Sequence, residues 1–110
     1  MHELTIAESI VEAVRARIGE RRVSQVRLQI GQLSGVSVDS LRFCFDLAVL
    51  GTTLDGARLD IEERAGRARC AGCEQDFGVS DLILLCPCGS ADVRILEGDE
   101  LRIMSVEVAC

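Results

Sequence analysis

Four of the six cysteines lie within one stretch of nineteen residues, where they form two close pairs. Cys70 and Cys73 are separated by two residues, Cys86 and Cys88 by one, and twelve residues lie between the pairs. This spacing lets two tight turns present four thiolates to a single tetrahedral metal ion. A segment of about 30 residues cannot bury enough apolar surface to fold without such a staple. The sequence therefore predicts a metal-binding lobe at these cysteines.

The ligand set favours a structural ion. Four thiolates leave no open position for the water that a catalytic zinc needs, so structural Zn(II) is the first interpretation. A rubredoxin-like iron site uses similar turns and is an alternative, as are disulfide-bonded or unrelated buried cysteines. The Cys86-Pro87-Cys88 pair is one residue shorter than the usual spacing. The start of the chain lacks the layout of a signal peptide, so clustered cysteines indicate reduced thiols in the cytoplasm.

Composition narrows the function classes. The 110 residues carry a net charge of −6, every basic residue is Arg, and the only aromatic residues are Phe43, Phe45 and Phe77. An acidic chain with so few stacking rings is a poor nucleic-acid binder. No apolar run approaches the roughly 18 residues of a membrane span. The sequence also shows no paired-carboxylate site, phosphate loop or serine-nucleophile pattern, so the chain is predicted not to be an enzyme.

Apolar periodicity predicts two helices. Thr5 to Glu8 reads as a capping box, and the helix that follows is predicted to end at Gly19. Its apolar residues recur at helical spacing, at Ile6, Ile10, Val11, Val14 and Ile18. A second helix is predicted to begin at Ser37 or Asp39 and to close at Gly51. Cys44 on this helix is predicted to be a buried small apolar residue, and Cys110 a free thiol.

Alternating segments predict three strands, around residues 25–30, 59–61 and 101–108. The cysteine stretch falls between the second and third strands. We therefore predict an α+β fold, in which a three-stranded sheet with two helices carries an inserted zinc-ribbon-like lobe. The predicted domains are residues 1–65 with 99–110 for the α/β body, and residues 66–98 for the lobe.

The amino terminus carries the only histidine, His2. The imidazole is too large for removal of the preceding methionine, so the chain keeps its Met1 amine. The amine, two backbone amides and the imidazole are four nitrogen donors able to lie in one plane, which selects Ni(II) or Cu(II) over Zn(II). By itself a histidine at this position is a weak indication, and an incidental His2 stays open.

Several segments in order along the whole chain resemble the HypA/HybF family, the nickel metallochaperones of [NiFe]-hydrogenase maturation. In addition to the paired cysteines, the resemblance is carried by Met1-His2-Glu3-Leu4, Gly31-Gln32-Leu33-Ser34-Gly35-Val36, Phe43-Cys44-Phe45-Asp46, Gly51-Thr52-Thr53-Leu54, Gly89-Ser90, Gly98-Asp99-Glu100-Leu101 and Ser105-Val106-Glu107-Val108.

The resemblance implies a nickel carrier with two metal sites. Ni(II), the transferred cargo, would bind at Met1, His2 and Glu3 through the amine, the amides of His2 and Glu3, and the His2 imidazole. Zn(II) would bind at the four cysteines. The implied partners are the maturation GTPase HypB and the [NiFe]-hydrogenase large subunit, and a homodimer is left open. The rival hypotheses are a zinc-ribbon protein-interaction module with no nickel role and a rubredoxin-like iron redox protein.

Overall fold

The computed structural model describes residues 2–81 and 83–110 and divides into two compact units. The helical unit comprises Met1–Leu28, Val36–Ile61 and Ile103–Cys110, and the cysteine unit comprises Gln29–Gly35 and Glu62–Arg102. The cysteine unit thus includes residues 29–35 as well as the predicted lobe. The division into a nickel-binding domain and a zinc-binding lobe stays a prediction.

The elements run in the order α1 (Glu3–Ile18), β1 (Val23–Gly31), α2 (Val38–Ala48), β2 (Arg58–Arg64), β3 (Gly66–Cys70), β4 (Asp76–Val79), β5 (Val93–Glu97) and β6 (Leu101–Val108). They form two three-stranded sheets, ordered β2-β1-β6 and β4-β3-β5. The predicted α+β class, with two helices and a three-stranded sheet, is confirmed. Among the described residues, neither helix has the length and apolarity needed to cross a membrane.

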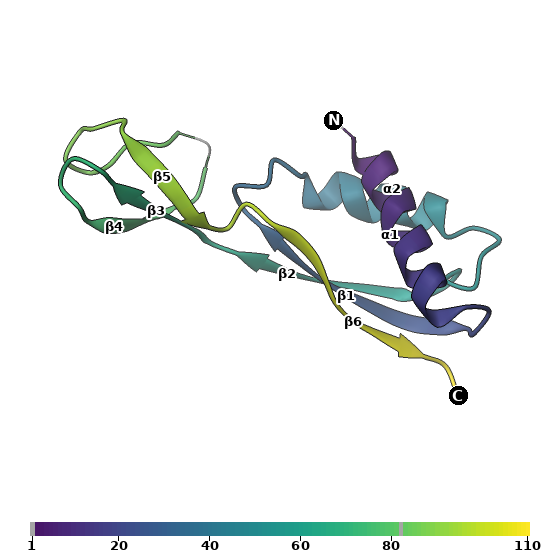
Figure 1. Cartoon of the computed structure of the whole chain (residues 1–110). Coiled ribbons are helices and arrows are strands. Elements are labelled where there is room, and N and C mark those ends of the chain that lie inside the picture. Colours follow the sequence, from purple (N-terminus) through teal and green to yellow (C-terminus); the bar gives the residue numbers. More distant parts are fainter. Residues whose placement is uncertain (1, 82) are drawn as a thin grey trace. The chain divides into compact units, whose positions relative to one another are not determined.

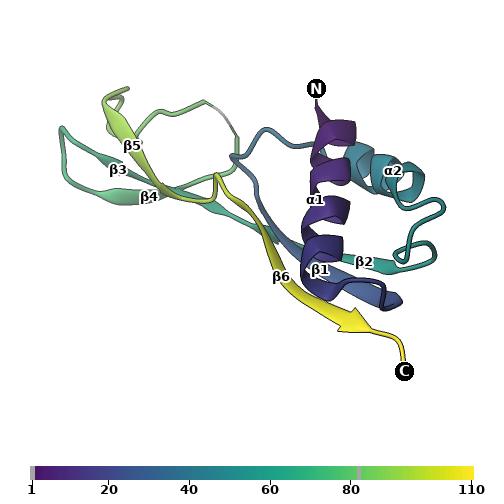
Figure 2. The same cartoon turned by 45° about the vertical axis from the view of Figure 1, so that its right-hand side comes forward.

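The core of the helical unit follows the apolar periodicity. In α1, Ala7, Ile10, Val11 and Val14 are buried on one side of the helix. Both helices lie on the same side of strands β1 and β2 (Figures 1 and 2). Further buried residues come from β1, α2 and the loop after α2; they are Val26, Leu28, Leu41, Phe45 and Leu54. The core is aliphatic except for one phenylalanine ring.

The predicted start of α1, with Thr5 as the N-cap, is wrong by three residues. The helix begins at Glu3 with His2 as its N-cap, and the backbone N–H of Ile6 donates to the His2 carbonyl at 3.0 Å. Thr5 therefore lies inside the first turn and caps nothing. The physical reason is tertiary, because the buried Glu3 carboxylate accepts a hydrogen bond from the Ser37 backbone N–H at 3.1 Å. Gly19 ends the helix as predicted, with φ +76°.

Helix α2 starts as predicted, but it ends at Ala48 instead of Gly51, and Cys44 is less buried than predicted. The Ser37 hydroxyl oxygen accepts from the Ser40 backbone N–H at 3.3 Å, which makes Ser37 the N-cap. Cys44, predicted to be buried, is only half-buried, whereas its neighbour Phe43 is 66% exposed. The helical period explains this arrangement, since Leu41 and Phe45 point to the core and Phe43 lies on the opposite side.

The cysteine unit has its own sheet, which the sequence did not indicate. Strand β3 lies between β4 and β5, and both pairings are antiparallel. Alternate residues of β3 are buried, and its Ala68 forms a small core with Leu33 and Val79. The half-buried residues Phe77, Leu84 and Ile95 pack against that core. The cysteine cluster therefore adjoins a small hydrophobic core.

Candidate metal centres

The four clustered cysteines come from two turns of the cysteine unit. Cys70 is the last residue of β3. Its backbone N–H donates to the Gln75 carbonyl at 3.0 Å and closes the turn that contains Cys73. In the second turn, the Cys86 N–H donates to the Ser90 carbonyl at 2.9 Å and the Gly89 N–H donates to the Cys86 carbonyl at 2.8 Å. Gly89 takes φ +97°, a conformation that glycine adopts without a side-chain penalty. In each turn, backbone hydrogen bonds thus fix the positions of the two cysteines.

The sulfur atoms fit a single tetrahedral ion. The Cys70 and Cys88 sulfurs lie 3.8 Å apart, the Cys73 and Cys86 sulfurs lie 3.5 Å apart, and all four atoms lie within 4.8 Å of one another. Four thiolates at the usual Zn–S distance would stand about 3.8 Å from each other. All six cysteines are free thiols, so the disulfide alternative is contradicted. The short Cys86-Pro87-Cys88 spacing still brings both sulfurs into the cluster.

Backbone N–H groups and neighbouring thiols set the acidity of the cluster. The Cys73 N–H, 3.5 Å from the Cys70 sulfur, is the main cause that lowers the pKa of Cys70 to about 6. The Cys88 N–H also favours a thiolate at Cys86, but burial and the neighbouring thiols outweigh it and raise the pKa of Cys86 to about 12. One thiol therefore ionises readily while another holds its proton, because several thiolates together need a cation to balance them.

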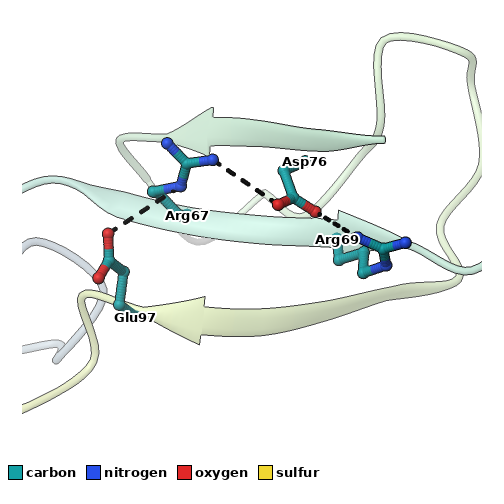
Figure 3. Close-up of polar contacts among 4 residues, drawn as sticks. All are labelled: Arg67, Arg69, Asp76 and Glu97. Atoms are coloured by element: carbon teal, nitrogen blue, oxygen red, sulfur yellow. Dashed lines mark hydrogen bonds and ion pairs between the residues drawn. The ribbon is translucent and has the colours of Figure 1, made fainter. Parts of the chain in front are cut away.

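The exposed face of the same sheet carries a ladder of ion pairs across the three strands (Figure 3). Arg69 of β3 lies 3.1 Å from Asp76 of β4, while Arg67 lies 3.8 Å from Asp76 and 4.0 Å from Glu97 of β5. All four side chains are at least one-third exposed, so each pair is worth only about 0–1 kcal/mol. The ladder follows the antiparallel register, which places Arg69 opposite Asp76 and Arg67 opposite Glu97, and it adds little to the stability of the sheet.

The predicted nickel residues lie at the start of α1, apart from Met1, which falls outside the described residues. His2 is exposed, and its imidazole does not cap the helix. The hydrogen-bond ladder of α1 begins at the bond from Ile6 to His2, so it does not use the backbone N–H groups of His2 and Glu3. The helical hydrogen bonds therefore do not involve the backbone N–H groups of His2 and Glu3, the two amides that the resemblance assigns to nickel.

The Glu3 side chain points inward. Glu3 is only 6% exposed, and its carboxylate accepts from the N–H of Ser37, the N-cap residue of α2. This hydrogen bond is the main cause that lowers the pKa of the Glu3 carboxyl. The contact ties the first turn of α1 to the first turn of α2. Sequence reasoning left the role of this carboxylate open, because a contact across 34 residues has no local pattern.

Comparison with known proteins identifies the family. Residues 1–108 match the family model described as "Hydrogenase/urease nickel incorporation, metallochaperone, hypA". The chain belongs to this family. Its members are metallochaperones and maturation factors, which confirms the prediction that the chain is not an enzyme.

Individual relatives and solved structures support the same family. The hydrogenase maturation factor HypA of Geobacter metallireducens is 44% identical over 109 residues, which are 98% of this chain and 99% of that protein. The hydrogenase maturation factor HypA of Chlorobium limicola is 46% identical over 112 residues, with 98% and 97% covered. The solution structure of the Ni metallochaperone HypA from Helicobacter pylori matches with a TM-score of 0.68 at 24% identity, covering 98% and 97% of the two chains. That likeness shows the fold.

Proposed function

We propose that this chain carries Ni(II) at its amino terminus and helps to insert it into the large subunit of a [NiFe]-hydrogenase. The cargo would bind through the Met1 amine, the amides of His2 and Glu3, and the His2 imidazole. One observation carries the proposal within a chain of this family: the exposed His2 directly precedes a helix whose hydrogen bonds begin at the His2 carbonyl. Planar nitrogen donors of this kind select Ni(II) over Zn(II).

A carrier must bind its cargo selectively and still release it. Ligands at a chain terminus can exchange, whereas a closed set of four thiolates holds its ion. The buried Glu3 carboxylate supports this arrangement, because it anchors the helix start without covering His2. The Glu3 side chain is thus placed to position the terminus.

The four cysteines are proposed to hold a structural Zn(II) ion. Their sulfur separations suit tetrahedral coordination, and no position is left for a substrate. When bound, the ion would balance the thiolate charge that the backbone N–H groups alone do not balance. Its loss would leave β3–β5 with the small Ala68 core.

Membership of a maturation family implies work with the hydrogenase maturation machinery. The proposed partners within that machinery are the maturation GTPase HypB and the hydrogenase large subunit. The proposed compartment is the cytoplasm, where the thiols stay reduced.

Calorimetric nickel titration of protein with an untagged Met1 tests the proposal, together with metal analysis of the same samples. We expect His2→Ala, or one residue added before Met1, to abolish nickel binding while the zinc content is unchanged. Thr5→Ala is the matched control, because Thr5 is exposed in the same helical turn. Unchanged nickel affinity in both altered proteins would reject the carrier assignment. A red protein that contains iron in place of zinc would reject the structural zinc.

A further inference from the structure

Helix α2 presents apolar side chains to solvent on the side away from its core. Phe43, Leu47 and Leu50 are 66%, 49% and 63% exposed. Their spacing of four and three residues places them on one side of the helix, and the bond from the Leu50 N–H to the Leu47 carbonyl continues that turn. The buried Leu41 and Phe45 lie on the opposite side.

Carboxylates flank these apolar residues. Asp39 and Asp46 fall on the same side of α2 by helical spacing, and both are exposed. Within residues 2–81 and 83–110, no ion pair or hydrogen bond engages either carboxylate. The one basic residue of α2, Arg42, donates to the Leu59 carbonyl at 2.8 Å. We call Asp39, Phe43, Asp46, Leu47 and Leu50 the α2 outer face.

The carboxyl end of α2 adds further negative potential. The last turn of α2 contains no basic residue, and Asp46 lies close to the partial negative charge of the helix end. Helix α1 shows the ordinary arrangement, with Arg15 and Arg17 in its last turn. Arg42 lies near both carboxylates by helical spacing but donates to the Leu59 carbonyl, and with two carboxylates against this one guanidinium the α2 outer face remains an apolar surface of net negative charge.

We propose that the α2 outer face docks a protein of the maturation machinery whose contact surface is apolar and flanked by Arg or Lys side chains. This inference rests on the proposed function, since it names the surface through which the carrier would meet a partner. Phe43 would be the central anchor, because buried aromatic rings dominate the energetics of interfaces. The carboxylates would steer the encounter and set its register.

Charge argues against a second copy of this chain as the occupant. Pairing two α2 helices about a two-fold axis would bring the same carboxylates of both copies together, and each chain carries a net charge of −6. A basic partner would neutralise the charges of Asp39 and Asp46, whereas a second copy would place its own two carboxylates beside them. The chemistry of the surface thus selects the partner class.

The test uses two variants on the surface and two controls away from it. Phe43→Ala combined with Leu47→Ala removes the apolar centre, and Asp39→Asn combined with Asp46→Asn removes the charge. Ile83→Ala, an apolar residue 70% exposed in the cysteine unit, is the apolar control. Glu8→Gln combined with Glu12→Gln on α1 is the charge control. Circular dichroism and thermal unfolding verify that each variant is folded.

The probes are purified HypB and purified hydrogenase large subunit from the same organism, each titrated separately by calorimetry. For the probe that binds, we expect the apolar variant to lose affinity by roughly 30-fold or more. The charge variant should bind more weakly and lose much of the salt dependence of binding. The two controls should bind as the wild type does.

Three results would overturn the inference. The first is equal affinity of the wild type and both surface variants for the probe that binds. The second is wild-type protein that binds neither probe. The third is a concentration-dependent dimer of the wild type that the apolar variant abolishes, which would assign the surface to a second copy. Nickel titration of the same samples keeps the proposed carrier function separate, because none of these substitutions touches His2 or its neighbours.

Discussion

Gly98 lies close to Gly31 and Gly66 in the cysteine unit, and this crowding predicts the effect of a substitution at Gly98. Gly98 has φ +97°, and a Cβ added there would overlap the Cα atom of Gly66 and lie 2.9 Å from the Ala65 carbonyl oxygen. Gly89 has the same φ of +97°, but an added Cβ would meet no atom within 4 Å. The two glycines therefore share one backbone conformation and differ in the space around them.

The two Ala substitutions should differ in cost for this reason. Gly89→Ala carries only the left-handed strain, about 1–2 kcal/mol. Gly98→Ala carries the same strain together with an overlap against backbone, which cannot move aside as a side-chain tip can. Overpacking of this kind adds about 1–3 kcal/mol, so Gly98→Ala should destabilise the cysteine unit by about 2–5 kcal/mol.

Hydrogen exchange of backbone amides in β3 and β5 measures both losses in the metal-loaded protein. Because about 1.4 kcal/mol is a factor of ten in an equilibrium constant, Gly98→Ala should lower protection roughly 30-fold or more. Gly89→Ala should lower it about 5- to 30-fold. Gly89 belongs to the same turn as Cys86 and Cys88, so its substitution could also affect metal binding. Metal analysis therefore verifies that both variants keep the bound ion. Equal loss of protection in the two variants would refute the crowding around Gly98.

Three further predictions concern the cores and the pH dependence. Phe45→Ala should destabilise the helical unit by about 3–5 kcal/mol, whereas Phe43→Ala should change its stability by less than about 0.5 kcal/mol, as measured by thermal unfolding followed by circular dichroism. Removal of the metal with a chelator, or Cys73→Ser, should abolish amide protection in β3–β5 and leave that of α1 unchanged. Folding lowers the pKa of the Glu3 carboxyl below its ordinary value of 4.5, so the carboxylate contributes stability that is lost when it is protonated. The free energy of unfolding of nickel-free protein should therefore decrease as the pH falls below about 4.5. The Glu3→Gln protein, which has no carboxyl at this position, should show a smaller decrease.

Each of these expectations has a clear contrary result. Equal destabilisation by the two phenylalanine substitutions would contradict the orientation of α2. Full protection of β3–β5 after metal removal would show that the Ala68 core suffices alone. A Glu3→Gln protein with the same acid sensitivity as wild type would mean that the bond to Ser37 contributes nothing to the pH dependence.

The sequence predicted the elements whose pattern is local. The period of α1, the Ser37 cap and the strand at residues 25–30 each depend on neighbours a few residues apart, and each is confirmed, although Gln29 of that strand is buried where the alternation predicted an exposed side chain. The cysteine cluster was predictable for a similar reason, since the spacing within each pair fixes a turn. Family-like segments then pointed to the metallochaperones, which the comparison confirmed.

The sequence failed where a distant contact decides the structure. The first turn of α1 begins early because Glu3 meets Ser37, a contact that no capping pattern encodes. The sheet β4-β3-β5 was missed because its strands are only four or five residues long. Such short strands are held by pairing across the sheet rather than by a strong alternation of their own. The exposure of Phe43 became visible only once the helix had a fixed core side.

Two segments that carried the resemblance meet in the structure, and their close approach explains why each begins with a glycine, Gly31 in one and Gly98 in the other. The Gly31 N–H donates to the Glu100 carbonyl at 2.7 Å, and the Leu33 N–H donates to the Gly98 carbonyl at 2.8 Å. A Cβ on Gly31 would overlap the Gly98 carbonyl, so a side chain at position 31 would push these backbones apart. These segments therefore serve backbone packing, and among the described residues the cluster that could hold a metal ion consists of the four cysteines and includes no residue of either segment. It follows that Gly98→Ala should weaken the cysteine unit while nickel titration at the amino terminus stays unchanged; a parallel loss of both would show that this packing also supports the nickel site.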